Sequence, residues 1–181
     1  KKISCYVQLS FRELNHLRSF VVSSYYVFTV IESHDGQQPR SSSEAKEKKF
    51  SGCLQKEVFF DTFTKKEIFW YKNGKLHRDN DLAAYFRFNE GQLTEQEWYK
   101  EGELHRDNNM IARDWYDLKQ WIVHGKLHRT DGPAEIEIHH TKDSIEEYKT
   151  WYIDDTEYSI EEYWNHPTVV EYKLNEILGK K

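Results

Sequence analysis

The chain has 181 residues, of which 15% are aromatic and 31% are charged, and its net charge is −5. The aromatic content excludes a disordered chain, because disordered chains lack the residues from which a core is built. The charge is uneven, at +3 over residues 1–50, −1 over 51–134 and −7 over 135–181. This distribution argues against binding to nucleic acid or to an anionic membrane.

The cysteine content and the hydropathy of the chain indicate the cellular compartment in which we expect the protein. The two cysteines, Cys5 and Cys53, are too few for a disulfide framework and favour a reducing, intracellular setting. The longest apolar stretch, residues 20–31, is interrupted by serine and threonine and is too short for a membrane span. The sequence shows no signal peptide, so we expect an intracellular protein.

The first 33 residues predict a small α+β piece. Residues 3–9 are typical of a strand, and the capping-box pattern from Ser10 to Glu13 predicts a helix over about 11–18. Residues 20–32 are rich in Val, Tyr, Phe and Thr and predict one long or two short strands. The polar residues 34–49, with Gly, Pro and Ser, predict a linker or loop between this piece and the rest of the chain.

Residues 50–158 predict a row of antiparallel β-hairpins, because aromatic and charged residues alternate with a period of two. The predicted strand pairs are 57–60 with 67–71, 83–88 with 97–100, 112–116 with 120–123, and 134–139 with 147–153. The predicted turns are 64–66, 89–91, 117–119 and 141–143.

A block of 14 residues occurs three times within this region, at Trp70–Ala83, Trp98–Ile111 and Trp121–Ala134. Each copy begins with Trp, has Gly four residues later, and continues with Leu-His-Arg. The joins between copies differ in length, as surface loops do. A fixed block predicts stacked supersecondary units, with a degenerate fourth copy starting at Trp151 as the terminal one.

The C-terminal residues 159–181 predict a helical cap. Ser159–Glu162 is a second capping box, and Pro167 suits the first turn of a further helix that Gly179 ends. Val170, Leu174, Ile177 and Leu178 follow at helical spacing. We expect this apolar stripe to cover the exposed edge of the last hairpin.

The three blocks resemble the MORN-variant repeat, Trp-Tyr-x-x-Gly-x-x-His-Arg-x-Asp-Gly-Pro-Ala, over about residues 57–155. The Asp-Gly-Pro-Ala ending occurs only at residues 131–134. The resemblance implies a mainly β fold of tandem hairpins, as found in giant DNA viruses, acting in the virion or the infected host cell. It also implies a role as an attachment or scaffold module.

The repeated side chains are the candidate site residues, and we expect them to form the framework of the repeat. They are Trp70, Gly74, His77, Arg78, Trp98, Gly102, His105, Arg106, Trp121, Gly125, His128 and Arg129. The framework hypothesis has histidines capping carbonyl groups and arginines stacking on tryptophan or pairing with aspartate. The alternative is an arginine row that binds phosphate.

Metal binding is disfavoured at both groups of histidines. Equivalent histidines of neighbouring hairpins would lie roughly 10 Å apart, too far to share one ion. The second group is His139-His140 with His166, whose acidic flanks favour a solvated loop. We expect no metal and no cofactor.

A second row of aromatic residues is the candidate interaction surface. The Trp-Tyr pairs place Tyr71, Tyr99 and Tyr152 on the face opposite the tryptophans, with Arg78, Arg106 and Arg129 at the rim. An uncovered row would bind a protein partner or a second copy, forming a homodimer. We therefore expect a non-enzymatic interaction or scaffold module, with binding of phosphorylated lipid headgroups through the arginine row as the alternative.

Overall fold

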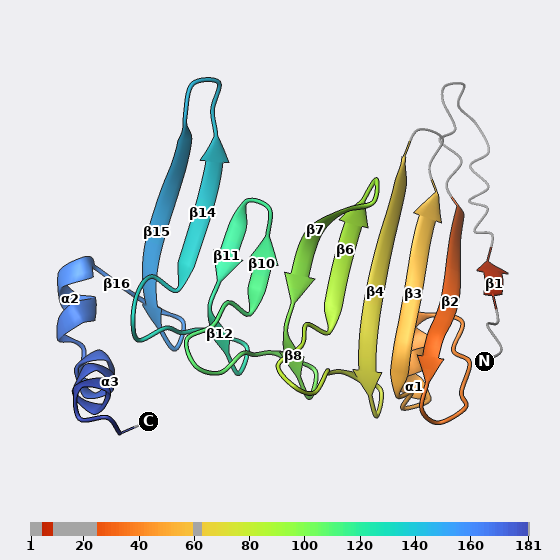
Figure 1. Cartoon of the computed structure of the whole chain (residues 1–181), viewed down its shortest axis with the longest axis horizontal. Coiled ribbons are helices and arrows are strands. Elements are labelled where there is room, and N and C mark those ends of the chain that lie inside the picture. The colour runs from red at the N-terminus through yellow and green to blue at the C-terminus, as the bar shows by residue number, and fades with distance from the viewer. Residues whose placement is uncertain (1–4, 9–24, 60–62, 181) are drawn as a thin grey trace. The chain divides into compact units, whose positions relative to one another are not determined.

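The computed structural model describes residues 5–8, 25–59 and 63–180, so the predicted helix over 11–18 lies outside the described residues. The chain divides into two compact units, residues 1–96 and residues 97–181. Both are mainly antiparallel β-sheet, as the alternation predicts, and two helices follow the last strand (Figure 1). No helix of the described residues is both long enough and apolar enough to cross a membrane.

The first unit is an antiparallel sheet whose long central strands are β2, β3 and β4 (Figure 1). In sheet order the strands are β1 (Cys5–Gln8), β2 (Tyr25–Ser33), β3 (Gly52–Phe59), β4 (Thr64–Lys72), β6 (Tyr85–Asn89) and β7 (Gln92–Glu97), with β5 (Lys75–Leu76) paired to the end of β4. Because β1 pairs with β2 and β2 pairs with β3, the described residues Cys5–Gln8 and Tyr25–Ser33 continue the hairpin sheet.

The turn predicted at residues 64–66 is wrong. Thr64 already pairs with Phe59, and Lys65 and Lys66 lie within β4. Lysine is compatible with a strand when its stem lies along a neighbouring aromatic ring, and the Lys66 ammonium lies 4.7 Å from the centre of the Phe88 ring.

The linker predicted over residues 34–49 is also wrong in its second half, which forms helix α1 (Ser42–Glu47). The Ser41 hydroxyl caps it by accepting a hydrogen bond from the Glu44 N–H. Ala45 and Phe50 are fully buried there, in a core that also contains Phe28, Val30, Leu54 and Tyr71. A single alanine and the phenylalanine that follows the helix thus dock a polar segment onto the sheet.

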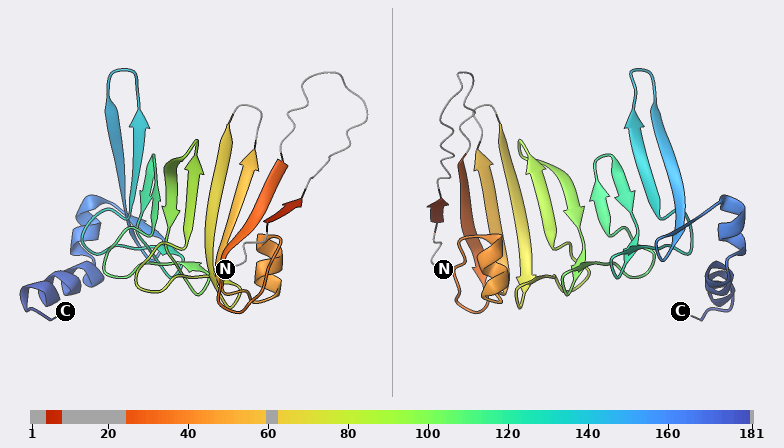
Figure 2. Two further views of the ribbon diagram at one scale, coloured as in Figure 1. Left: turned by 45° about the vertical axis from the view of Figure 1, so that its right-hand side comes forward. Right: turned by 180° about the vertical axis from the view of Figure 1, so that it is seen from behind.

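Most strands of the second unit are short, and its hairpin β14–β15 has the longest of them (Figure 2). They are β8 (Tyr99–Lys100), β9 (Glu103–Leu104), β10 (Arg113–Trp115), β11 (Leu118–Gln120), β12 (Ile122–Val123), β13 (Lys126–Leu127), β14 (Glu135–His140), β15 (Ile145–Ile153) and β16 (Thr156–Tyr158). Strands β10, β11, β14, β15 and β16 neighbour one another in that order, and β8 with β9 and β12 with β13 form separate small ladders.

The predicted strands 97–100 and 120–123 are wrong as continuous elements, because each breaks at a tryptophan. One strand ends at Glu97 and the next begins at Tyr99, and likewise at Gln120 and Ile122. The turn predicted at 117–119 is wrong as well, since Leu118–Gln120 is strand β11. The turns at Glu90–Gly91 and Thr141–Ser144 agree with the prediction.

Two C-terminal helices follow β16, namely α2 (Ile160–Asn165) and α3 (Pro167–Ile177). Both hydrogen bonds of the capping box between Ser159 and Glu162 are present, as predicted. A small cluster of Ile153, Tyr163 and Val169 holds the helices against the end of β15.

The apolar stripe predicted to cover the last hairpin is instead exposed. Val170, Leu174, Ile177 and Leu178 all lie on the surface, and the Ile177 side chain is 81% exposed. Val169, one position away, is the residue that α3 buries. Helix α3 also packs on α2, with the Lys173 ammonium 3.8 Å from the centre of the Trp164 ring.

Candidate functional site

Each copy of the block contains a two-residue turn in which both residues have positive φ. These pairs are Asn73–Gly74, Glu101–Gly102, His124–Gly125 and Asp154–Asp155, with φ between 50° and 92°. The flanking registers agree, with Tyr71 opposite Leu76, Tyr99 opposite Leu104, Ile122 opposite Leu127 and Tyr152 opposite Glu157. This is the type I′ turn of two-residue hairpins. The glycines therefore supply the conformation predicted for them, and Asp155 adopts it in the fourth copy.

The arginine of each block stacks on the tryptophan that opens it. The guanidinium carbon lies 4.1 Å from the ring centre for Arg78 on Trp70, 4.1 Å for Arg106 on Trp98 and 4.0 Å for Arg129 on Trp121. The same guanidinium groups donate from Nη1 to the carbonyl oxygens of Ala83, Ile111 and Pro133. The arginine therefore ties the beginning of the block to its end.

A buried alanine closes each block. The N–H groups of Trp70, Trp98 and Trp121 donate to the carbonyls of Ala84, Ala112 and Ala134, and all three alanines are fully buried. The blocks as aligned by sequence end at Ala83 and Ile111, which is one residue early. The connector of the third block is one residue shorter, and the Asn80–Asp81 and Asn108–Asn109 pairs, all with positive φ, accommodate the extra residue in the first two.

The repeated histidines link neighbouring copies of the block. In His105, which is buried, Nε2 lies 2.9 Å from Asp107 Oδ1 and Nδ1 accepts the N–H of His124 at 3.0 Å. These two partners place the proton of the neutral ring on Nε2. A hydrogen bond to Lys100 and a second to His105 lower the pKa of the Asp107 carboxyl. His128 makes the corresponding link through Nδ1, 2.9 Å from Asp154 Oδ1.

Backbone hydrogen bonds reinforce these links at equivalent positions. Gly125 N–H donates to the Leu104 carbonyl, and Asp155 N–H donates to the Leu127 carbonyl. Since tryptophan, glycine, histidine and arginine all have internal roles, the geometry supports the framework interpretation and leaves little of the arginine row to bind phosphate.

The predicted row of tyrosines does not form a common surface. Tyr71 is buried in the core of the first unit, and burial raises its pKa. Tyr99 donates its hydroxyl proton to Glu97, and burial together with that carboxylate raises its pKa far above the usual value. Tyr152 is only half-buried. An interaction surface of this chain would therefore consist of other residues.

A buried polar network lies on the sheet of the second unit. Glu97 accepts hydrogen bonds from Arg113 and from the Trp115 indole in addition to Tyr99. Gln120 continues the network by accepting from Arg113 and donating to Glu135. Alternation treats such residues as solvent-facing, so the sequence carries no signal for this network.

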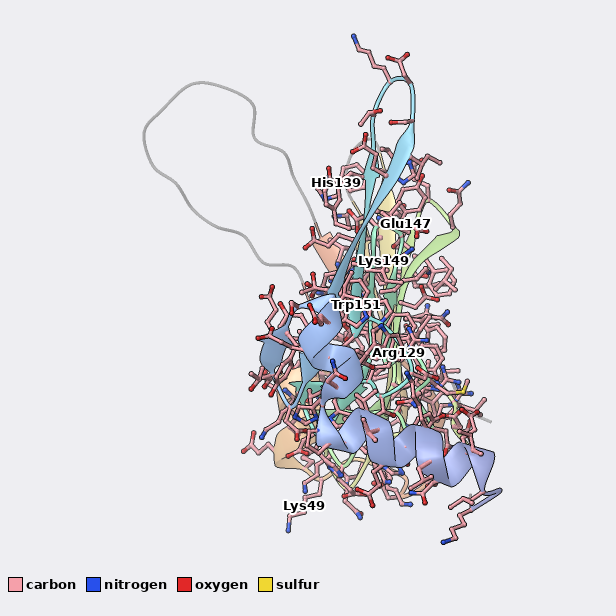
Figure 3. The ribbon with its side chains drawn as sticks, turned by 90° about the vertical axis from the view of Figure 1, so that its left-hand side faces the viewer. Lys49, Arg129, His139, Glu147, Lys149 and Trp151 are labelled. Atoms are coloured by element: carbon pink, nitrogen blue, oxygen red, sulfur yellow. The ribbon has the colours of Figure 1, made fainter. Side chains whose placement is uncertain are left out.

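The longest hairpin of the second unit, β14–β15, carries exposed aromatic and apolar side chains that do not recur in the blocks. Ile145 is 68% exposed and Tyr148 is 53% exposed, and Tyr116 of the neighbouring hairpin is 71% exposed. His140 stacks on Tyr116 and His139 contacts Tyr148, with ring centres 5.1 and 4.7 Å apart. Figure 3 shows His139, Glu147 and Lys149 along this hairpin. His166 lies elsewhere, at the N-cap of α3.

An open groove of about 240 Å³ lies beside this hairpin. Its lining residues come from β10–β11 and from β14, and they are Trp115, Asp117, Leu118, Glu137, Ile138 and His139. No group of three or more histidine, cysteine, aspartate or glutamate residues suited to a metal ion occurs among residues 5–8, 25–59 and 63–180.

Comparisons with known proteins do not assign the chain. No protein-family model matches the sequence, and no curated protein and no solved structure has a significant match to it.

Proposed function

We propose that this chain is a non-enzymatic protein-interaction or scaffold module built from MORN-like hairpin repeats, of the kind found in proteins of giant DNA viruses. The proposal rests on a difference between the repeated side chains, which make internal contacts, and the unrepeated side chains, many of which are exposed. The repeated Trp, Gly, His and Arg residues are used in internal contacts of the block. Most of the exposed apolar side chains lie outside the blocks, with Leu82 and Met110 as the exceptions.

The exposed apolar side chains concentrate in residues 97–181, which supports a binding surface there. Eight of them lie on the β10–β11 turn, the β14–β15 hairpin and the C-terminal helices, namely Tyr116, Ile145, Tyr148, Ile160, Val170, Leu174, Ile177 and Leu178. They form two groups, one toward the tip of the β14–β15 hairpin and one on the C-terminal helices, and exposed apolar groups of this size favour a protein partner. The partner is another protein or a second copy of this chain.

Cross-linking mass spectrometry on the native source material, beside the purified protein, tests this function. We expect stoichiometric cross-links from lysines of residues 97–181, such as Lys142 and Lys149, to one major protein or to a second copy. Co-purifying lipid together with an absence of protein cross-links would contradict the proposal and would favour binding of phosphorylated lipid headgroups.

A further inference from the structure

We propose that the groove between β10–β11 and β14 binds an arginine or lysine side chain of an extended segment of the partner protein. The inference rests on the proposed function and specifies the chemistry of the partner. It has three supports, which are the shape of the groove, its charge and an unpaired stretch of strand edge beside it.

The groove exists because the two hairpins differ in length. The register of β11 with β14 ends at Leu118 opposite Glu137, followed by one hydrogen bond from Ile138 N–H to the Asp117 carbonyl. Strand β14 continues to His140, paired only with β15 in the part of the chain that the structure describes. The shorter hairpin thus leaves a step, with Trp115 and Leu118 on one side and Ile138 on the other.

The step offers backbone groups as well as side chains. Because the Ile138 N–H points toward β11, the N–H and C=O of His140, two residues further, point in the same direction. An extended segment beside them would continue the sheet where β11 stops. Addition of a strand to an exposed edge supplies backbone hydrogen bonds, and side-chain pockets supply the specificity.

The charge of the groove selects a cation. Asp117 and Glu137 are its two carboxylates, and no hydrogen bond or ion pair of the Asp117 side chain occurs among the described residues. The Glu137 carboxylate contacts His139. By register, Glu135, Glu137 and Glu146 share one face of the sheet with Arg113, whose guanidinium group is already paired with Glu97. Residues 97–181 have 11 lysines and arginines against 19 aspartates and glutamates, a net charge of −8.

An arginine or lysine side chain matches this arrangement along its whole length. Its methylene groups would lie on Trp115 and Leu118, which the register places on the same face as Glu137, and its charged end would meet the carboxylates of Asp117 and Glu137. A neutral or acidic side chain would leave the Asp117 carboxylate beside it without a partner, which is unfavourable.

The test uses the full chain and a peptide with fluorescein on its N-terminus, fluorescein-Gly-Thr-Val-Arg-Val-Thr-Gly-amide, with fluorescence anisotropy as the readout. The comparison peptide has citrulline, which has the shape of arginine without its charge. The protein variants are the double substitution Asp117→Asn with Glu137→Gln, and a matched control, Glu171→Gln with Glu176→Gln. The control removes the same charge from the exposed surface of α3 in the same unit.

We expect the citrulline peptide and the groove variant each to weaken binding by about tenfold, as loss of a charge-assisted hydrogen bond does. The control variant should change affinity by less than about twofold. In ¹H–¹⁵N NMR spectra the peptide should shift the Trp115 indole and the amides of Leu118 and His140.

Three outcomes would overturn the inference: no binding of the arginine peptide at millimolar concentration, equal loss in the control variant, or full binding of the citrulline peptide. Its failure can be told apart from failure of the proposed function. If native cross-links from residues 97–181 to a partner persist in the groove variant, the module function stands and only the groove is excluded.

Discussion

The two units use the same kind of hairpin block but stabilise it differently. In residues 1–96 the first block lies over a core of large side chains, with Phe50, Leu54 and Tyr71 closed in by helix α1. In residues 97–181 the blocks depend on their own Trp–Arg stacks and on hydrogen bonds to neighbouring copies, and a buried apolar cluster lies at the C-terminal end.

This difference shows that the block determines its own local backbone shape. Which of its faces is buried depends on the elements that pack against it. The residue after the opening tryptophan is fully covered in one copy, Tyr71, and half-covered in another, Tyr152. Surfaces that one unit uses for its core remain available for a partner in the other.

The largest effect is expected for Phe50→Ala, which empties the centre of the core in the first unit. Replacing a fully buried phenylalanine by alanine should lower the free energy of unfolding by about 3–5 kcal/mol. Urea denaturation followed by circular dichroism measures it. A loss below about 1 kcal/mol would show that the first unit has no stronger core than the second.

Two glycines at equivalent turn positions, one in each unit, test this difference in packing. Gly74 and Gly125 occupy the same turn position, with φ of +77° and +75°. A Cβ at Gly74 would lie 2.6 Å from the Lys46 carbonyl oxygen, whereas nothing lies within 4 Å of a Cβ at Gly125. We expect Gly74→Ala to cost about 3 kcal/mol and Gly125→Ala about 1 kcal/mol, because only the first combines strain with a clash. Equal losses in urea denaturation would show that α1 does not pack against the turn.

In the second unit, Tyr163→Phe tests stabilisation by hydrogen bonds. The Tyr163 hydroxyl donates to the Arg129 carbonyl at 2.8 Å and accepts from the Gly132 N–H at 3.1 Å, joining α2 to the third connector. Its loss should cost about 1–2 kcal/mol, because the ring stays packed while the Gly132 N–H loses its partner. Thermal unfolding measures the loss, and an unchanged melting temperature would contradict this role.

The dependence of stability on pH tests the charged network around Glu67 in the first unit. Burial raises the pKa of Glu67, but hydrogen bonds and charge from Lys56 and Arg87 outweigh it and hold the pKa below its usual 4.5. A carboxyl with a depressed folded pKa stabilises the fold above its unfolded pKa, and this contribution is lost as the pH falls through the folded pKa. Glu67→Gln should therefore be less stable than the wild type at neutral pH, by a margin that narrows below about pH 4.5.

Urea midpoints between about pH 3 and 7 measure this margin. Glu90→Gln, an exposed turn residue of the same unit, is the control for the change in net charge. A margin that stays constant with pH would show that the ionised form of Glu67 does not contribute to stability.

The smallest effect is expected for Ile177→Glu on α3. Because this side chain is exposed, the substitution should change the free energy of unfolding by less than about 0.5 kcal/mol. Size-exclusion chromatography with light scattering should show whether the stripe joins two copies. A large loss of stability would mean that α3 packs through the stripe predicted from the sequence.

Local features could be predicted from the sequence because neighbouring residues determine them. The glycine turns follow from the need for positive φ, the helix at Ser159 from its capping box, and the hairpins from alternation. The stacking of Arg106 on Trp98, and of the equivalent pairs, follows from their fixed spacing in the block.

Only the tertiary structure decided which faces are buried. Ala45 and Phe50 turn a polar segment into part of the core, Val169 replaces the expected stripe as the buried residue of α3, and Glu97 is buried although its strand alternates. A period in the sequence specifies that a face is distinct, but whether that face meets a helix, water or a partner depends on distant residues. The step between β11 and β14 arises in the same way, from two hairpins of different length that pairing places side by side.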